Sequence, residues 1–221
     1  TGFKEYDDRN GGLPTTGVMI MAATTSGGKS VVSSNLEKNL AMHNENLRAS
    51  KITLEMSEEQ EANRILSMIS GVDFSKIKRQ QLSEREQKKI KKDMKEWRSK
   101  LKANNSQFSY LAGKKSRTID QLLAMLVAYA FNIIIIDYIS LLEGVDDDNQ
   151  WRMLSSVARS CKVFASEHNC LIILLAQLDT ESSKIRYSQG IKEHADVVWK
   201  WNYANEEVRA THVIPIEIDK V

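Results

Sequence analysis

The sequence predicts an α/β fold in which a mostly parallel central sheet is flanked by helices. Two observations carry this prediction. Short apolar runs alternate along the chain with longer helix-like segments, which is the order expected of a parallel sheet covered by helices. The first of these runs is followed by a glycine-rich turn and then a helix-like stretch, the context in which phosphate-binding loops occur.

Size, composition and charge place few restrictions on function. The 221 residues are enough for one large domain, so we treat residues 1–221 as a single one. No run of about 18 apolar residues is present, so we expect no membrane span and no membrane partner. A net charge of +2 gives no broad affinity for nucleic acid, and any DNA site must be local or shared among subunits.

The chain ends and cysteines suggest a cellular setting. The chain begins at Thr1 with neither an initiator Met nor a signal peptide, and it looks like a piece of a longer protein. Cys161 and Cys170 match no metal spacing. Cys170 opens an apolar run, so we expect a buried thiol, which suits a reducing cytosol.

The expected elements follow from periodicity and capping signals. Ser57 and Gln60 have the spacing of a capping box at the start of a helix. Strands are expected at residues 17–23, 51–55, 108–111, 132–138, 170–177, 197–201 and 212–218. Helices are expected at residues 29–44, 58–69, 83–103, 118–131 and 150–167.

The helix expected at residues 83–103 carries many charges around one narrow apolar seam. Its basic run, residues 88–92, admits two interpretations: a DNA-binding surface or a solvated outer face. We favour the solvated face, because acidic residues are interleaved throughout.

The glycine-rich turn fits the phosphate-loop pattern G-x-x-x-x-G-K-[ST] except at its first position, where Ala23 replaces glycine. Lys29 is expected to reach the β- and γ-phosphates, and the hydroxyl of Ser30 to bind Mg²⁺. A small residue serves at position 23 if its φ is not positive. The expected nucleotide-binding residues are Ala23, Thr24, Thr25, Ser26, Gly27, Gly28, Lys29, Ser30 and Val31.

Three further strands end in polar residues that a parallel sheet would bring to one edge. Asp137 follows four isoleucines and could hold Mg²⁺ opposite Ser30. Glu55 could orient or deprotonate the water that attacks the γ-phosphate. Gln177 could sense the γ-phosphate without adding charge. Each of the three also has a purely structural interpretation, as a residue that ends a strand or completes a turn.

Taken in order, these segments resemble the DnaB-type replicative helicases, whose motor domain is a RecA-like P-loop NTPase. The similar segments are Thr1-Gly2-Phe3, Gly11-Gly12-Leu13, Thr53-Leu54-Glu55-Met56-Ser57, Ile136-Asp137-Tyr138-Ile139-Ser140-Leu141, Leu175-Ala176-Gln177-Leu178 and His194-Ala195-Asp196-Val197-Val198. The resemblance spans nearly the whole chain. It implies that Glu55 is the catalytic carboxylate, that Asp137 is the Walker B acid and that Gln177 is the sensor.

The resemblance also implies cofactors and partners. These are ATP and Mg²⁺, a ring of six identical subunits with ATP at each interface, single-stranded DNA in the central channel, primase and a helicase loader. The family places a Lys-x-Arg pair after its last strand to reach the neighbouring subunit's nucleotide. Here either Lys220 begins that pair or the pair lies beyond residue 221.

The polar stretch at residues 178–190 is the expected contact with the DNA backbone. Its Lys and Arg supply positive charge and its serines supply neutral donors, which suit binding without sequence preference. The candidate residues are Ser182, Ser183, Lys184 and Arg186.

Two other functions remain compatible with the motifs. One is a RecA-type recombinase or clock-type ATPase on the same fold, which a filament in place of a ring would favour. The other is a nucleotide-gated loading or assembly module, which needs Lys29 and Ser30 but not Glu55. The segments around Glu55 and Asp196 favour the helicase.

Overall fold

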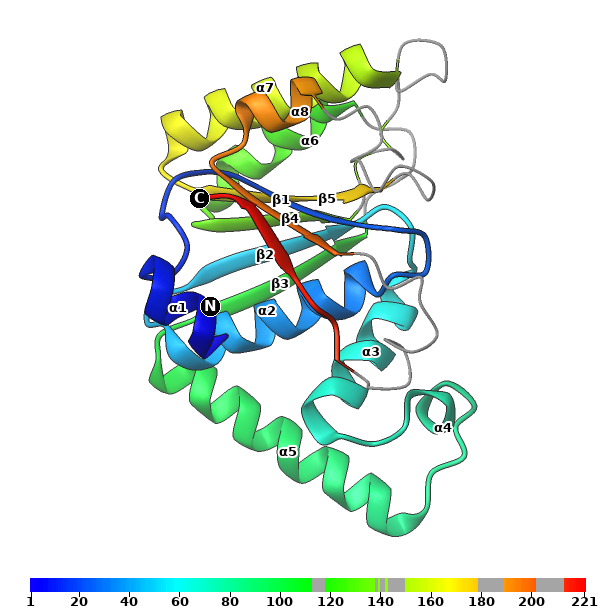
Figure 1. Ribbon diagram of the computed structural model, residues 1–221. Helices are drawn as coiled ribbons and strands as arrows, with labels where there is room; N and C mark the ends of the chain where they lie inside the picture. The colour runs from blue at the N-terminus through cyan, green and yellow to red at the C-terminus, as the bar shows by residue number, and fades with distance from the viewer. Residues whose placement is uncertain (113–117, 138, 140–141, 143–149, 179–188, 202–212) are drawn as a thin grey trace.

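The computed structural model describes residues 1–112, 118–137, 139, 142, 150–178, 189–201 and 213–221 (Figure 1). In chain order the elements are α1 (Lys4–Asn10), β1 (Gly17–Ala23), α2 (Lys29–His43), β2 (Arg48–Thr53), α3 (Glu58–Ser70), α4 (Phe74–Lys78), α5 (Glu84–Ala103), β3 (Gln107–Ala112), α6 (Ile119–Leu126), η1 (Val127–Tyr129), β4 (Ile133–Asp137), α7 (Gln150–His168), β5 (Leu171–Gln177), α8 (Gln189–His194), β6 (Val197–Trp201) and β7 (Glu217–Lys220).

The sheet has seven strands in the order β3-β2-β4-β5-β1-β6-β7. Every neighbouring pair is parallel except β6 and β7, which run antiparallel. The expected fold class, a mostly parallel sheet flanked by helices, is therefore confirmed. Because strands β1, β2, β4 and β5 run in one direction, their carboxyl ends meet at a single edge.

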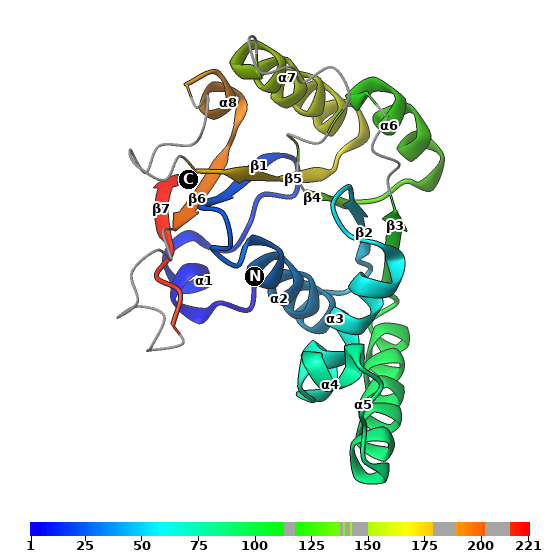
Figure 2. The same cartoon turned by 90° about the vertical axis from the view of Figure 1, so that its right-hand side faces the viewer.

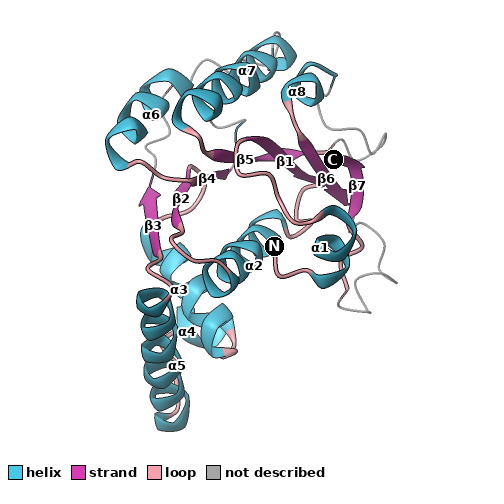
Figure 3. Cartoon of the chain, turned by 90° about the vertical axis from the view of Figure 1, so that its left-hand side faces the viewer, coloured by secondary structure: helices cyan, strands magenta, loops and turns pink. Residues whose placement is uncertain are grey.

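Helices cover both faces of the sheet (Figure 3). On one face, α6 and α7 pack on alternate residues of β1, β4 and β5, including Ile20, Ile134 and Ile172. On the other face, α1 and α2 pack on the intervening residues, including Met19 and Ile135. The central strands are buried on both sides, which explains why they consist of nearly continuous apolar runs and do not alternate.

Helix α5 and the short α4 project away from the sheet as an arm (Figure 2). No residue of α5 is buried, although Trp97 and Leu101 pack at the margin of the core. The charged face is paired mainly along the helix, as between Lys89 and Asp93, which are 2.8 Å apart. The interpretation of this helix as a solvated one fits these contacts.

Capping explains where several helices begin. The expected capping box of Ser57 and Gln60 is present at the start of α3. Ser83 and Glu86 form a second box at α5, and Thr118 and Gln121 form a third at α6. In each case the first side chain accepts from a backbone N–H that has no partner within the helix.

Several expected boundaries were wrong. The helix expected at residues 118–131 ends at Leu126, tightens into η1, and stops where Ala130 adopts a φ of 47°. The last strand is residues 217–220 and not 212–218, and β2 is residues 48–53 and not 51–55. The short helices α1, α4 and α8 were not predicted, because they are too brief to show a periodic pattern.

Asp196 fixes the start of the central strand β1. Its Oδ2 accepts a hydrogen bond of 2.8 Å from the backbone N–H of Val18, and the ammonium of Lys162 pairs with the same carboxylate. A Cβ at Gly17 would lie 2.2 Å from Oδ2, so this approach requires glycine. The segment 194–198 therefore has a structural role at the edge of the sheet opposite the phosphate loop.

Both cysteines are buried and neither forms a disulfide, as expected for Cys170. Burial raises the pKa of the Cys170 thiol to about 11, so it is protonated at neutral pH. Within the described residues, no helix is both long enough and apolar enough to cross a membrane.

Candidate nucleotide-binding site

The phosphate loop lies between β1 and α2, and its backbone is shaped by two glycines for different reasons. Gly28 has a φ of 78°, a left-handed conformation that favours glycine, and it directly precedes the first turn of α2. A Cβ at Gly27 would lie 2.8 Å from the carbonyl oxygen of Thr24 and 3.1 Å from the Cβ of Ala23, so Gly27 is required by close approach. Ser26 is also left-handed, with a φ of 58°.

Ala23, the departure from the loop pattern, is the last residue of β1 and pairs with both Gln177 and Trp201. The φ of Ala23 is not positive. The condition under which a small residue can replace glycine there is met. The same packing that needs glycine at position 27 leaves room for one methyl group at position 23.

Trp201 holds the loop from the neighbouring strand. It ends β6, and its indole N–H donates a buried hydrogen bond of 2.7 Å to the carbonyl oxygen of Gly27. This contact was not predicted from the sequence. The sequence did contain one signal. Trp201 is an aromatic residue at the carboxyl end of a strand, as Gln177 and Asp137 are polar residues at the carboxyl ends of theirs.

The side chains expected to act on the phosphates line one pocket of about 340 Å³ at this edge. It brings together the loop from Thr25 to Val31 with Glu55 and Gln177. Glu55 lies two residues beyond the end of β2 and is exposed. The amide of Gln177 donates a hydrogen bond of 2.6 Å to the hydroxyl of Thr25.

Met56 and Arg64 also line this pocket and were not predicted as site residues. Arg64 lies on α3, three residues after Glu61, and its guanidinium is 3.5 Å from the Glu61 carboxylate. The sequence did indicate that Arg64 could lie near the site. The capping box starts α3 at the edge of the sheet, and residues in the first two turns of that helix stay close to that edge.

Lys29 is directed into the loop. Its ammonium donates hydrogen bonds of 3.3 Å to the carbonyl oxygens of Ala23 and Thr24. Burial lowers the pKa of this ammonium, while the charges of Asp137 and Glu55 oppose the change. The influence of both carboxylates places them within electrostatic reach of Lys29.

Asp137 ends β4 at the same edge of the sheet, and its side chain is buried, with 2% exposed. Its Oδ2 is 3.7 Å from the ammonium of Lys51. Its Oδ1 is buried and has no hydrogen-bond partner among the residues that the structure describes. An unpartnered carboxylate oxygen is the hard donor that Mg²⁺ prefers, so this residue fits the expected metal.

No cluster of three His, Cys, Asp or Glu side chains suited to a metal occurs among the described residues. Sites for Mg²⁺ in nucleotide-hydrolysing proteins need only one or two protein ligands, because phosphate oxygens and water complete the coordination. Ser30 and Asp137 therefore remain a sufficient protein contribution.

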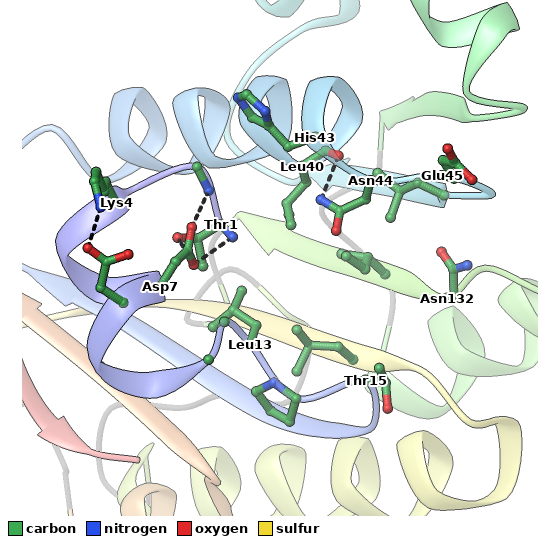
Figure 4. Close-up of a pocket in the computed structure, with 18 of the residues that line it drawn as sticks. Thr1, Lys4, Asp7, Leu13, Thr15, Leu40, His43, Asn44, Glu45 and Asn132 are labelled. Carbon is green, nitrogen blue, oxygen red and sulfur yellow. Dashed lines mark hydrogen bonds and ion pairs between the residues drawn. The ribbon is translucent and has the colours of Figure 1, made fainter.

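A larger hollow of about 760 Å³ lies at the opposite edge of the sheet, between α1, the end of α2 and the starts of β4 and β5 (Figure 4). Its polar groups are largely held by one another: the Asp7 carboxylate accepts from the Thr1 hydroxyl and from the backbone N–H of Gly2. Charges of both signs line it. Ligands of parallel α/β sheets bind at the carboxyl ends of the strands, so the smaller pocket is the candidate site.

The expected DNA contacts Ser182, Ser183, Lys184 and Arg186 lie outside the described residues. Lys220, the candidate start of the basic pair, ends β7 and donates a hydrogen bond of 3.3 Å to the carbonyl oxygen of Lys192.

With this geometry in place, comparison with known proteins decides the family. The sequence profile of the DnaB-like helicase C terminal domain matches residues 1–211. This chain belongs to that family. The resemblance inferred from the motifs is therefore confirmed.

Curated relatives of the DnaB-like family carry consistent names. The replicative DNA helicase DnaB of Geobacillus stearothermophilus is 26% identical over 240 residues, which cover 100% of this chain and 51% of that protein. The probable plasmid replicative DNA helicase of Chlamydia trachomatis is 27% identical over 208 residues, covering 90% of this chain and 45% of that protein. This chain thus spans about half the length of these relatives.

Solved structures confirm the fold. One of them, described as an ATPase domain, matches with a TM-score of 0.84 and 21% identity, covering 99% of this chain and 82% of that one. A DnaB-like replicative helicase solved to show its interactions with primase matches with a TM-score of 0.83 and 20% identity, covering 99% of this chain and 57% of that one. The RecA-like architecture expected from the motifs is the one observed.

Proposed function

We propose that this chain is the ATP-hydrolysing motor of a ring-shaped replicative DNA helicase. The observation that carries the proposal is the pocket in which the phosphate loop, Glu55 and Gln177 meet, at the edge of the sheet where β4 ends in the buried carboxylate of Asp137. A nucleotide triphosphate placed on the loop would have a carboxylate, an amide and an ammonium around its terminal phosphate. Membership of the DnaB-like helicase family supports strand separation in DNA replication as the work that this hydrolysis drives.

The residues divide the chemistry between them. Lys29 exchanges its two long bonds to carbonyl oxygens for charged bonds to the β- and γ-phosphates. Ser30 and Asp137 would hold Mg²⁺, which would supply positive charge to balance the negative charge of the phosphates. Glu55, which is exposed at the pocket, orients the attacking water and accepts its proton.

Gln177 is proposed to report the state of the γ-phosphate. Its amide is bonded to Thr25 on the loop, and it is the last residue of β5. The polar segment that carries the candidate DNA contacts follows directly in the sequence. A change in the hydrogen bonds of Gln177 could therefore move the segment that carries the candidate DNA contacts, because the two are joined directly by the backbone.

The partners follow from the family. We propose a homo-hexamer that binds ATP at its subunit interfaces and threads single-stranded DNA through its channel. Primase and a helicase loader are the proposed protein partners, and a similar DnaB-like helicase has been solved to show its interactions with primase. The RecA-type recombinase and the loading module are supported by no observation on the described part of this chain.

The test is ATP hydrolysis by the full-length protein, with and without single-stranded DNA, beside a Lys29→Ala control. We expect turnover that single-stranded DNA stimulates and that the Lys29 substitution abolishes. Turnover indifferent to DNA would contradict a DNA motor and favour a clock-type ATPase or a loading module.

A further inference from the structure

Lys51 is an ammonium enclosed in the interior of the sheet. Its side chain is 0% exposed, and three carboxylates surround it. Its Nζ lies 2.8 Å from Glu61 Oε1, 3.5 Å from Glu37 Oε1 and 3.7 Å from Asp137 Oδ2. The Ser34 hydroxyl lies 3.1 Å from the same nitrogen. These residues come from α2, β2, α3 and β4, so the cluster is assembled from across the fold.

Sheet register places Lys51 on the same face of the sheet as Asp137 and nearer the amino ends of the strands. Thr53 on β2 pairs with Asp137 on β4, and Lys51 pairs with Ile135. Because side chains two residues apart point to the same face, Lys51 and Asp137 share the face covered by α2. The ammonium thus reaches Asp137 from the side away from the pocket.

The two carboxylate oxygens of Asp137 are consequently not equivalent. Oδ2 faces the Lys51 ammonium, and Oδ1 is buried without a hydrogen-bond partner in the described part of the chain. The Lys51 ammonium is 3.7 Å from Oδ2, and its charge favours the orientation of the carboxylate in which Oδ1 points away from it. The partners that orient a metal-binding side chain in this way commonly change metal affinity when they are removed.

The charge on Lys51 is maintained by its surroundings. Burial alone lowers the pKa of this ammonium, but Glu37, Glu61 and Asp137 together reverse the effect and hold the pKa above its ordinary value.

We propose that Lys51 is a positioning residue for Mg²⁺, which fixes the orientation of Asp137 and leaves its Oδ1 directed at the metal. This inference rests on the proposed role of Asp137 in holding Mg²⁺. Lys51 itself is not proposed to touch nucleotide or metal, because its side chain is fully buried, does not line the pocket and carries the wrong charge to bind a cation.

The cluster also connects the two helices that border the pocket. Glu37 lies on α2, which begins at the phosphate loop, and Glu61 lies on α3, which carries Arg64 into the pocket. Glu61 shares its two oxygens between Lys51 and Arg64. Lys51 thus contacts the metal-binding carboxylate and a carboxylate from each of these helices at once.

The experiment must separate positioning from charge and from stability. Lys51→Met alone leaves three buried carboxylates without their cation and is expected to fold poorly. The double variant Lys51→Met, Glu61→Gln removes one positive and one negative charge, so the net charge of the cluster stays unchanged while Asp137 loses its partner. Glu61→Gln alone is the matched control, because it keeps the contact between Lys51 and Asp137.

The readout is binding of a fluorescent, slowly hydrolysed ATP analogue to the full-length protein, first in EDTA and then across a Mg²⁺ titration. We expect the double variant to match Glu61→Gln in EDTA, because both lose the ion pair between Glu61 and Arg64, and to require roughly 10-fold more Mg²⁺ at the midpoint. Glu61→Gln should keep the wild-type midpoint. An unchanged midpoint in the double variant would overturn the inference, as would an equal loss of affinity with and without Mg²⁺.

Asp137→Asn separates this inference from the function on which it rests. If Asp137→Asn shifts the Mg²⁺ midpoint and the double variant does not, Lys51 has only a structural role. If Asp137→Asn leaves the midpoint unchanged, the proposed metal ligand and the positioning by Lys51 are both wrong.

Discussion

At the scale of single residues, Glu37 has a buried carboxyl group whose pKa is raised. Burial raises that pKa from 4.5 to about 7, although the charge of Lys51 opposes the change. A carboxyl group whose pKa is higher in the folded chain stabilises the fold fully below its unfolded pKa. That contribution is lost as the pH rises through the folded pKa. For Glu37 the loss falls between pH 4.5 and about 7.

Replacing Glu37 with Gln should therefore flatten the dependence of stability on pH. The amide resembles the protonated acid, so the variant should gain stability relative to the wild type as the pH rises from about 5 to 8. Thermal unfolding midpoints of both proteins across this range provide the measurement. Two parallel curves would show that Glu37 does not titrate in this window.

In the proposed mechanism, Glu55 is the residue on which hydrolysis depends most directly. Its substitution by Gln removes the base but keeps the size and the hydrogen-bonding capacity of the side chain. We expect nucleotide binding to persist and hydrolysis to fall by roughly 100-fold or more. Binding and turnover should be measured on the same preparation. Turnover at the wild-type rate would exclude Glu55 from catalysis.

At the scale of elements, the sequence predicted best the strands that are buried on both faces. Residues 132–138 and 170–177 were recognised because burial on two sides demands an apolar run, and β4 and β5 occupy nearly those bounds. The placement of Asp137 and Gln177 at one edge of the sheet followed from the same strand assignments, because parallel strands bring their carboxyl ends to one edge.

Other features could not be predicted because their cause is tertiary. In the sequence, Lys51 is an ordinary polar residue near a strand end. Its burial is stabilised by ion pairs with Glu37 and Glu61, which two helices place beside it in the folded chain. Trp201 contacts a loop that lies far away in sequence, at Gly27. The last strand was misplaced because β7 is exposed throughout and carries no apolar pattern.

The contact between β6 and the phosphate loop gives a prediction at this scale. Trp201→Phe keeps an aromatic ring but leaves the carbonyl oxygen of Gly27 buried without its donor. We expect a loss of about 1–3 kcal/mol in the free energy of unfolding. Affinity for ATP should fall as well, because the loop is no longer held in one conformation. Stability lost with unchanged affinity would show that Trp201 supports the core and not the loop.

At the scale of the whole molecule, one edge of one sheet gathers the phosphate loop, Glu55, Asp137 and Gln177, while the proposed work is done on DNA. Arg186 lies outside the described residues, and its assignment rests on the sequence alone. If it contacts a phosphate, Arg186→Ala in the full-length protein should weaken binding to single-stranded DNA and reduce the slope of log affinity against log salt by about 1. An unchanged slope would remove this segment from the DNA interface.

The proposed motor is tested most directly by strand separation. A forked duplex with a labelled strand should be unwound by the full-length protein only when ATP is present. Full-length Glu55→Gln should bind ATP and the fork yet release no strand. Strand release that needs ATP and is lost in this variant is the predicted result. ATP hydrolysis without strand release from the fork, under conditions where the protein binds DNA, would contradict the account and indicate a different use of the same ATPase fold.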